Sequence, residues 1–332
     1  MDKFKVMPSN KRIFFYIVIA ELVIILCLVY GLTHKHKIYV DPIWIKLYNF
    51  GNSSTFKYYY EPKPGQRIGP NTPFGASYTA HYSVNFDSLY SLTNYQVNKP
   101  EKTFRIVTLG NSFTAGLYVN TGRDWPSDLE HLLTESLKCT NINKFEVINL
   151  GVEGYDAAYE AERFKIRGEK YNPDLVLWFH TEFKKITELT MPIYFANLVK
   201  ARHTRELAQQ FKNKNYYVEW DSGKEQVANE LGDVKIFKYQ IGQITKMGVL
   251  YKGKIGFVLD PVSISNDAKS ALKTLVAKRG NAFIIDSLRN FYKEDGVFPR
   301  DPHPNEKGDK MIAEDIYKYL VDNKIVSCSK SN

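Results

Sequence analysis

Five short apolar runs occur in the last two thirds of the chain, and polar stretches separate them. Each run is rich in Val, Ile, Leu or Phe and is bounded by Gly, Pro, Asn or Asp. A short continuous apolar run of this kind indicates a strand buried on both faces, as in a parallel sheet. The runs lie at 104–109, 145–150, 174–179, 255–259 and 282–285.

Helical periodicity fills the intervals between these runs. The segment 126–138 starts with a proline, and its leucines recur at helical spacing on one stripe. Further helices are expected at 157–171, 268–278 and 306–320. Strands that alternate with helices predict an α/β fold, a doubly wound three-layer α/β/α sandwich, with its ligand site beyond the carboxyl ends of the strands.

The segment 184–250 interrupts this alternation. It contains a predicted helix around 193–211, followed by a polar section. An insertion of this size between the third and fourth strands has two interpretations. It covers the ligand site, or it is an extra packed subdomain.

The N-terminal part differs from the rest. Residues 13–32 are apolar except for Glu21, and at about 1.5 Å per residue they span the ~30 Å hydrocarbon layer. More Lys and Arg residues precede this segment than follow it closely, which places residues 1–12 in the cytoplasm and the remainder outside. The sequence therefore predicts one transmembrane helix, a single-pass anchor, and then an extended or β-rich lead-in at 33–100, rich in Tyr, Pro, Asn and Ser.

Composition adds little to this picture. The apolar fraction of 44% is typical of a folded protein, and the net charge of +9 favours anionic neighbours such as a membrane surface. No nucleic-acid-binding motif is present, so we expect no nucleic-acid partner. No Cys/His cluster has the spacing of a metal site, and we expect neither metal nor cofactor. Cys139 and Cys328 form one disulfide or remain two thiols.

Candidate chemistry lies at two distant points of the chain. Ser112 follows the first apolar run, and Asp301 and His303 lie close to the C-terminus. A serine hydroxyl becomes a nucleophile when an imidazole removes its proton and a carboxylate orients that imidazole. Two of these residues also have a simpler interpretation: Ser112 caps a helix, and His303 caps the helix that starts near residue 305.

These motifs resemble those of the SGNH (GDSL-type) hydrolases. The resemblance rests on Gly-Asn-Ser at 110–112, on Asn-Leu-Gly-Val-Glu-Gly at 149–154 and on Asp-x-His at 301–303, and it covers about 101–325. The lead-in is similar to that of membrane-anchored members. The resemblance implies a flavodoxin-like sheet, with Ser112 as nucleophile, His303 as base and Asp301 as the carboxylate.

The resemblance also implies an oxyanion hole made by the backbone N–H groups of Ser112 and Gly154. The chain departs from the family pattern in two places. Asn111 replaces the usual aspartate, and no asparagine follows the third strand. The third oxyanion donor is therefore absent or supplied by His180 or Thr181, and one lost donor costs about 2.7–4 kcal/mol.

Together these features predict a membrane-anchored serine esterase or deacylase that acts outside the cytoplasm. The expected partners are an ester-bearing small molecule or glycan, such as a cell-envelope glycan or lipid, and the membrane through the N-terminal helix. Two alternatives remain open: an O-acyltransferase in polysaccharide modification, and a catalytically silent fold that serves as a binding or scaffold protein.

Overall fold

The computed structural model describes residues 19, 21–23, 47–71, 80–203 and 217–328. Asp41–Asn332 form one compact unit. The predicted cytoplasmic segment 1–12 lies outside the described residues, as do most of the predicted span 13–32 and the start of the lead-in. Within the described ranges, none of the helices combines the length and the apolar character that a membrane crossing requires.

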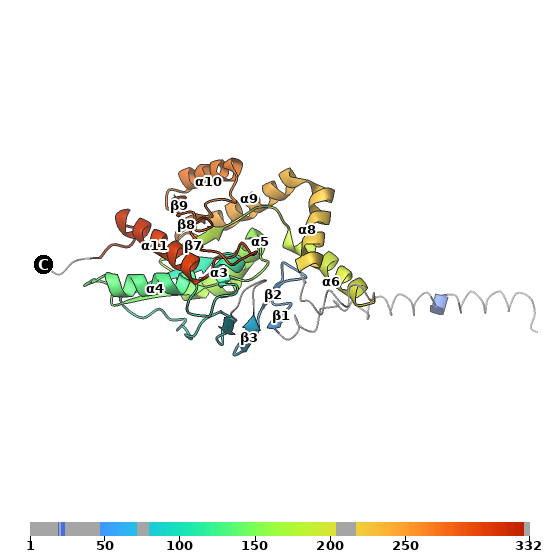
Figure 1. The fold of residues 1–332 in the computed structure, drawn as a ribbon, viewed down its shortest axis with the longest axis horizontal. Coiled ribbons are helices and arrows are strands. Elements are labelled where there is room, and N and C mark those ends of the chain that lie inside the picture. Colours follow the sequence, from blue (N-terminus) through green and yellow to red (C-terminus); the bar gives the residue numbers. More distant parts are fainter. Residues whose placement is uncertain (1–18, 20, 24–46, 72–79, 204–216, 329–332) are drawn as a thin grey trace, which may run out of the picture. The chain divides into compact units, whose positions relative to one another are not determined.

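A five-stranded parallel sheet forms the centre of the unit Asp41–Asn332 (Figure 1). Its strands lie close to the predicted runs: β5 (Thr103–Leu109), β6 (Lys144–Asn149), β7 (Leu175–His180), β8 (Lys254–Leu259) and β9 (Ala282–Ile285). The strand order is β6-β5-β7-β8-β9, so the first strand along the chain lies inside the sheet and not at its edge. This flavodoxin-like order has a switch point between β5 and β7, where α/β proteins of this kind bind ligands.

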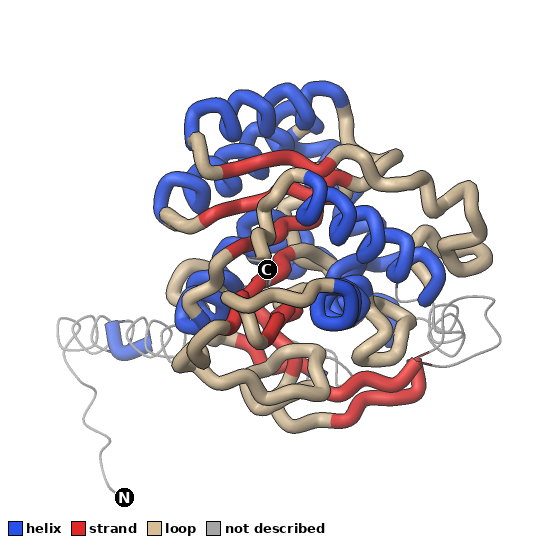
Figure 2. Tube along the Cα trace, turned by 90° about the vertical axis from the view of Figure 1, so that its left-hand side faces the viewer, coloured by secondary structure: helices blue, strands red, loops and turns tan. Residues whose placement is uncertain are grey.

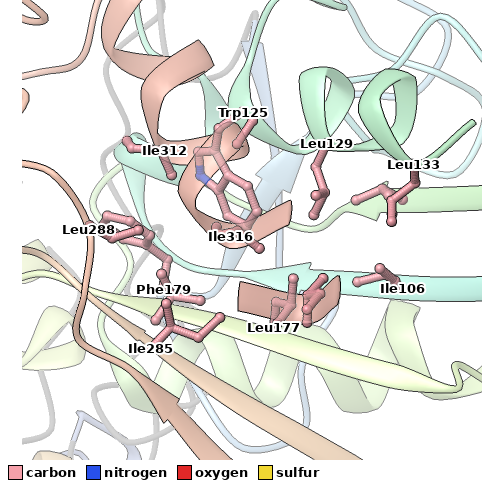
Figure 3. Close-up of a cluster of buried hydrophobic side chains, with 14 of the residues drawn as sticks. Ile106, Trp125, Leu129, Leu133, Leu177, Phe179, Ile285, Leu288, Ile312 and Ile316 are labelled. Atoms are coloured by element: carbon pink, nitrogen blue, oxygen red, sulfur yellow. The ribbon is translucent and has the colours of Figure 1, made fainter. Parts of the chain in front are cut away.

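Helices cover both faces of the sheet, as Figure 2 shows. On one face, α4 (Trp125–Ser136) and α11 (Glu306–Asp322) pack over a cluster of buried side chains from β5, β7 and β9 (Figure 3). Ile312, Ile316 and Leu320 of α11 are completely buried there, and each contributes about 1.5–3 kcal/mol. The prediction of an α/β fold with a parallel sheet is thus confirmed.

The opposite face is covered by α5 (Ala157–Arg163), α9 (Asp233–Leu250) and α10 (Asn266–Arg279). Side chains alternate along each strand, so Trp178 packs toward these helices while Phe179 packs toward α4 and α11. This alternation decides which residues at the strand ends can meet each other.

The predicted insertion is divided in the structure. α6 (Thr187–His203) starts earlier than expected and packs against α8 (Tyr217–Leu231), and the supposed polar section contains helices. α9 is a crossover helix of the sandwich, because its Ile244 and Met247 are buried against the sheet. Only the part before α9 lies outside the sandwich pattern, and residues 204–216 are not described.

The lead-in carries two small antiparallel ladders, β1 (Tyr48–Phe50) with β2 (Tyr60–Pro62) and β3 (Arg67–Asn71) with β4 (Ala80–Ser83). It packs on the sandwich through Glu61, which is fully buried and paired with Arg163 and Arg167 of the α5 region. Removal of one partner of a buried ion pair leaves the other charge buried without compensation, which costs about 3–5 kcal/mol. The lead-in is therefore an integral layer of the folded unit.

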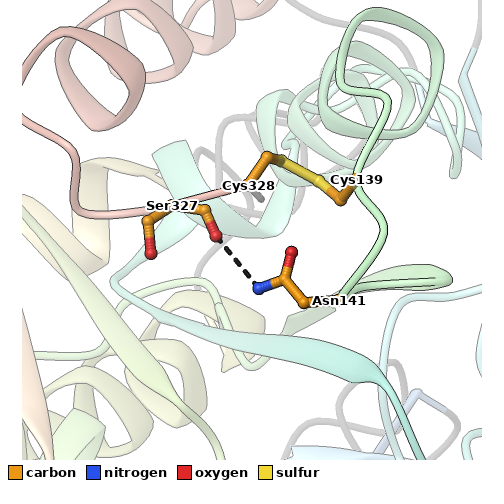
Figure 4. The surroundings of a disulfide bond; sticks show 4 residues. All are labelled: Cys139, Asn141, Ser327 and Cys328. Carbon is orange, nitrogen blue, oxygen red and sulfur yellow. Dashed lines mark hydrogen bonds between the residues drawn. A yellow bond between two sulfur atoms is a disulfide. The ribbon is translucent and has the colours of Figure 1, made fainter. Parts of the chain in front are cut away.

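The two candidate cysteines meet in the structure (Figure 4). Cys139, after α4, forms a disulfide with Cys328, after α11, and their Cα atoms are 4.7 Å apart. Asn141 Nδ2 donates a hydrogen bond to the carbonyl of Ser327 at 3.3 Å beside this bond. The disulfide ties the C-terminal segment to the end of α4.

Candidate active site

A tight turn at the end of β5 presents Ser112. Gly110 is required there, because a Cβ at this position would lie 2.2 Å from Thr114 Oγ1. Asn111 caps the four-residue helix α3 (Ser112–Ala115) by accepting a hydrogen bond from the Phe113 N–H at 3.1 Å. Because Asn111 is the cap, Ser112 is not used for capping.

The loop before α11 brings Asp301 and His303 to this turn. His303 Nε2 lies 2.8 Å from Ser112 Oγ, and His303 Nδ1 lies 2.5 Å from Asp301 Oδ1. The backbone N–H of His303 also donates to Asp301 Oδ1 at 2.9 Å. The structure therefore assembles a hydroxyl, an imidazole and a carboxylate into one hydrogen-bonded chain.

The carboxylate of Asp301 is held in its ionised form. Burial favours the neutral acid, but the hydrogen bonds from the His303 ring and backbone and the charge of the imidazole outweigh burial, so the pKa of Asp301 lies below its usual value. An ionised Asp301 accepts the Nδ1–H of His303 and fixes the tautomer that leaves Nε2 facing Ser112.

Asn305, not His303, caps helix α11. Its side-chain oxygen accepts from the N–H groups of Lys307 and Gly308, and its amide donates to the carbonyls of Asp295 and Val297. These bonds brace the loop that carries Asp301 and His303. The interpretation of His303 as a helix cap is therefore wrong.

The segment after β6 runs directly against the nucleophile turn. Val152 N–H donates to the carbonyl of Gly110 at 3.3 Å, and a Cβ on Gly151 would lie 2.3 Å from Ala115 N. Gly154 follows with a φ of +75°, where a Cβ would meet the Tyr60 hydroxyl and the Trp220 ring. The lead-in and α8 thus border the expected oxyanion glycine.

Thr181 lies at the nucleophile turn, as the predicted donor role requires. Its Oγ1 accepts a hydrogen bond from Asn111 Nδ2 at 2.9 Å. Because Thr181 accepts here, the hydrogen of its own hydroxyl remains to be donated to another acceptor. An aspartate at position 111 has no hydrogen to give and would take that of Thr181.

His180 is placed differently. Its ring packs against Trp178, Phe183 and Phe257 in the layer beneath α9 and α10, and only 3% of the residue is exposed. Burial lowers the pKa of His180 to about 3, so the ring is neutral. The structure does not support His180 as an oxyanion donor, because strand alternation directs its side chain away from the face on which Phe113 and Phe179 lie.

Sequence reasoning missed a buried support beneath the site. Asn149 donates to the carbonyl of Thr114 at 2.7 Å and to Asp124 at 3.3 Å, and it accepts from Gly151 N–H at 2.8 Å. It therefore joins helix α3, the residue before α4 and the segment after β6 at the carboxyl edge of the sheet. The available signal was Asn149 itself, a polar residue inside the apolar run 145–150 and the first residue of the motif 149–154, to which sequence reasoning gave no role.

Among the described side chains, no group of three or more His, Cys, Asp or Glu residues is arranged to hold a metal ion. The expectation that the protein uses no metal or cofactor stays a prediction.

No family model and no curated protein matches the chain. Similar solved structures include the psychrotrophic esterase EstA from Pseudoalteromonas sp., 13% identical, with a TM-score of 0.42 over 67% of this chain and 98% of that one. The Clostridium thermocellum family 3 carbohydrate esterase is 15% identical, with a TM-score of 0.37 over 68% and 100%. A mutant of Axe2, an acetyl-xylooligosaccharide esterase from Geobacillus, is 12% identical, with a TM-score of 0.39 over 69% and 97%. Similarity at these identities and TM-scores does not assign roles to residues of this chain.

Proposed function

We propose that this protein is a serine hydrolase of ester bonds, with Ser112 as nucleophile, His303 as general base and Asp301 as the carboxylate that orients the imidazole. The hydrogen-bonded chain from Ser112 Oγ through His303 to Asp301, with contacts of 2.8 and 2.5 Å, carries this proposal. This arrangement raises the nucleophilicity of a serine hydroxyl at neutral pH.

The proposed reaction has two halves. His303 Nε2 takes the proton of Ser112 as Oγ attacks the ester carbonyl, and a tetrahedral oxyanion forms. The protonated imidazole then gives this proton to the leaving alcohol oxygen, which leaves an acyl group on Ser112. Water attacks the acyl-enzyme with His303 again as base, and the acid is released as Ser112 regains its proton.

We propose three donors for the oxyanion: the backbone N–H groups of Ser112 and Gly154, and the hydroxyl of Thr181. The hydrogen bond from Asn111 to Thr181 Oγ1 supports the third. It orients the threonine and leaves its hydrogen for the developing negative charge. Asn111 and Thr181 together would thus replace the missing asparagine after the third strand.

We propose that the ester lies outside the cytoplasm, in a cell-envelope glycan or lipid, and that the N-terminal segment anchors the enzyme in the membrane. The apolar segment 13–32 and the net charge of +9 support this location. The Cys139–Cys328 disulfide supports it as well, because disulfides persist in oxidising compartments.

Labelling by a fluorophosphonate probe tests the proposal without knowledge of the substrate. Wild-type protein should be labelled and Ser112→Ala should not, because the probe captures the activated hydroxyl. Ser136→Ala removes an exposed serine of α4 and is the matched control. If folded wild-type protein is not labelled by the probe, the proposal is wrong, and the result favours the catalytically silent fold that serves as a binding or scaffold protein.

Product analysis then identifies the acyl acceptor. Active enzyme that has not been exposed to the probe is incubated with an acetylated glycan and a second glycan that has no acetyl groups. Release of free acetate in preference to transfer supports the hydrolase. Transfer to a sugar hydroxyl that outpaces release would instead identify an O-acyltransferase, which uses the same acyl-enzyme.

A further inference from the structure

Tyr118 has an unusual backbone conformation close to the proposed active site. Its φ is +69°, in the left-handed region that bulky residues avoid. The residue is buried, with an exposed fraction of 4%. Such a conformation persists only where the surroundings enforce it, and it is concentrated at functional sites. Tyr118 lies in the turn that follows α3, just after the nucleophile.

The ring of Tyr118 contacts the imidazole of His303. The two rings meet edge to face, with centroids 5.8 Å apart and an interplanar angle of 89°. The ring centroid of Phe113 lies 5.0 Å from that of the same imidazole. Phe298 lies edge-on to Tyr118, with the two ring centroids 5.9 Å apart. Tyr118 and Phe113 therefore limit the positions that the His303 ring can occupy between Asp301 and Ser112.

The lead-in holds Tyr118 in this conformation. The backbone N–H of Tyr118 donates to the hydroxyl of Tyr82, on β4, at 2.6 Å, and this bond is buried. Neighbouring bonds join the same two segments: His81 N–H donates to Asn120 Oδ1 at 2.9 Å, and Ser83 N–H donates to Thr121 Oγ1 at 3.0 Å. Strand β4 thus acts as a clamp on the turn 118–121.

We propose that Tyr82 and Tyr118 are positioning residues for His303, so that the lead-in is a working part of the active site. This inference rests on the proposed function, in which His303 is the base. Loss of the Tyr82 hydroxyl leaves a buried N–H without that acceptor and removes one constraint on a strained residue. The turn then relaxes, and the imidazole loses its edge contact.

The test compares Tyr82→Phe with Tyr95→Phe. Both changes remove one lead-in hydroxyl that bonds to the backbone and keep the ring, but the Tyr95 hydroxyl donates to the carbonyl of Val147, inside the sheet. We expect Tyr82→Phe to slow fluorophosphonate labelling about 10- to 100-fold, with Tyr95→Phe close to wild type. Equal labelling rates for the three proteins would overturn the inference.

Proton NMR supplies a readout that does not depend on reactivity. The His303 Nδ1–H in its bond to Asp301 should give a downfield signal in wild type and Tyr95→Phe, and this signal should broaden or disappear in Tyr82→Phe. A merely structural role for Tyr82 would leave the signal unchanged in the folded variant. If wild type is not labelled, the proposed function fails, while the NMR comparison still decides the positioning role.

A second pair of variants examines Tyr118 directly. Tyr118→Ala removes the ring that contacts His303, whereas Tyr118→Phe keeps it. We expect the labelling rate and the downfield signal to be lost in Tyr118→Ala and restored, relative to it, in Tyr118→Phe. Identical behaviour of the two variants would exclude the ring contact as the means of positioning.

Discussion

Two histidines near the carboxyl edge of the sheet occupy opposite environments. His303 has a carboxylate on one ring nitrogen and the Ser112 hydroxyl on the other. His180 is enclosed by aromatic rings, and burial lowers its pKa to about 3. The same side chain is thus a proposed proton carrier in one region and a neutral packing group in the other. Hydrogen-bond partners and solvation decide the chemistry that the residue type merely permits.

The largest expected effect separates these two roles. His303→Ala should slow fluorophosphonate labelling by roughly 10⁴-fold or more, because Ser112 loses its base. His180→Phe should label like wild type, since an apolar ring replaces a buried ring nitrogen, Nε2, without a hydrogen-bond partner within the described structure. Exposed His131, on α4, gives a third variant, His131→Ala, as a control. A large loss of labelling rate in a folded His180→Phe variant would contradict the role of His180 as a neutral packing group.

An intermediate effect is expected at the residue after His180. Thr181→Val removes the proposed third oxyanion donor and should slow labelling about 10²-fold. Thr181→Ser keeps the hydroxyl and should retain most of the rate. Asn111→Asp should also slow labelling, because the new carboxylate takes the Thr181 hydrogen and places negative charge beside the oxyanion. Wild-type rates in Thr181→Val would show that this hydroxyl only orients Asn111.

The smallest expected effect on activity is at His180, where the change is confined to stability and its dependence on pH. The folded-state pKa of His180 is about 3, below the ordinary 6.5, so the unfolded chain takes up the proton first as pH falls. The contribution of His180 to stability is therefore complete above pH 6.5 and declines toward pH 3. Between pH 6.5 and 4.5, wild type should lose about 2–3 kcal/mol more than His180→Phe.

Urea denaturation of both proteins at pH 7 and pH 4.5 measures this difference. Carboxyl groups titrate in both proteins, so their contributions largely cancel in the comparison. Parallel losses of stability in wild type and His180→Phe would mean that the His180 ring is hydrated and protonates normally.

The parts that the sequence predicted well depend on local patterns. The strands β5 to β9 follow from continuous apolar runs, and α4 and α11 follow from apolar stripes at helical spacing. The crossover helix α9 was missed although Ile241, Ile244 and Met247 lie at helical spacing, because its whole segment was assigned to the insertion 184–250. Ser112, Asp301 and His303 could be named because a nucleophile, a base and a carboxylate occur at the positions that the resemblance requires.

The arrangement of side chains around these residues could not be predicted. Successive side chains along a strand point to opposite faces of the sheet. His180 is therefore buried in one layer, while the next residue, Thr181, reaches the nucleophile turn on the other side. The support from Tyr82 to Tyr118 and then to His303 joins three segments that share no sequence pattern.

Hydrophobic periodicity is a local property of the chain, so the sequence alone predicted the five strands of the central sheet and the helices α4, α5, α10 and α11, but not α8 and α9. The sequence also supplied the chemical groups of the proposed site. Only the tertiary structure placed Ser112 against His303, 191 residues apart, and joined the lead-in to both. Such contacts depend on how the layers pack, and packing is decided by the whole chain at once.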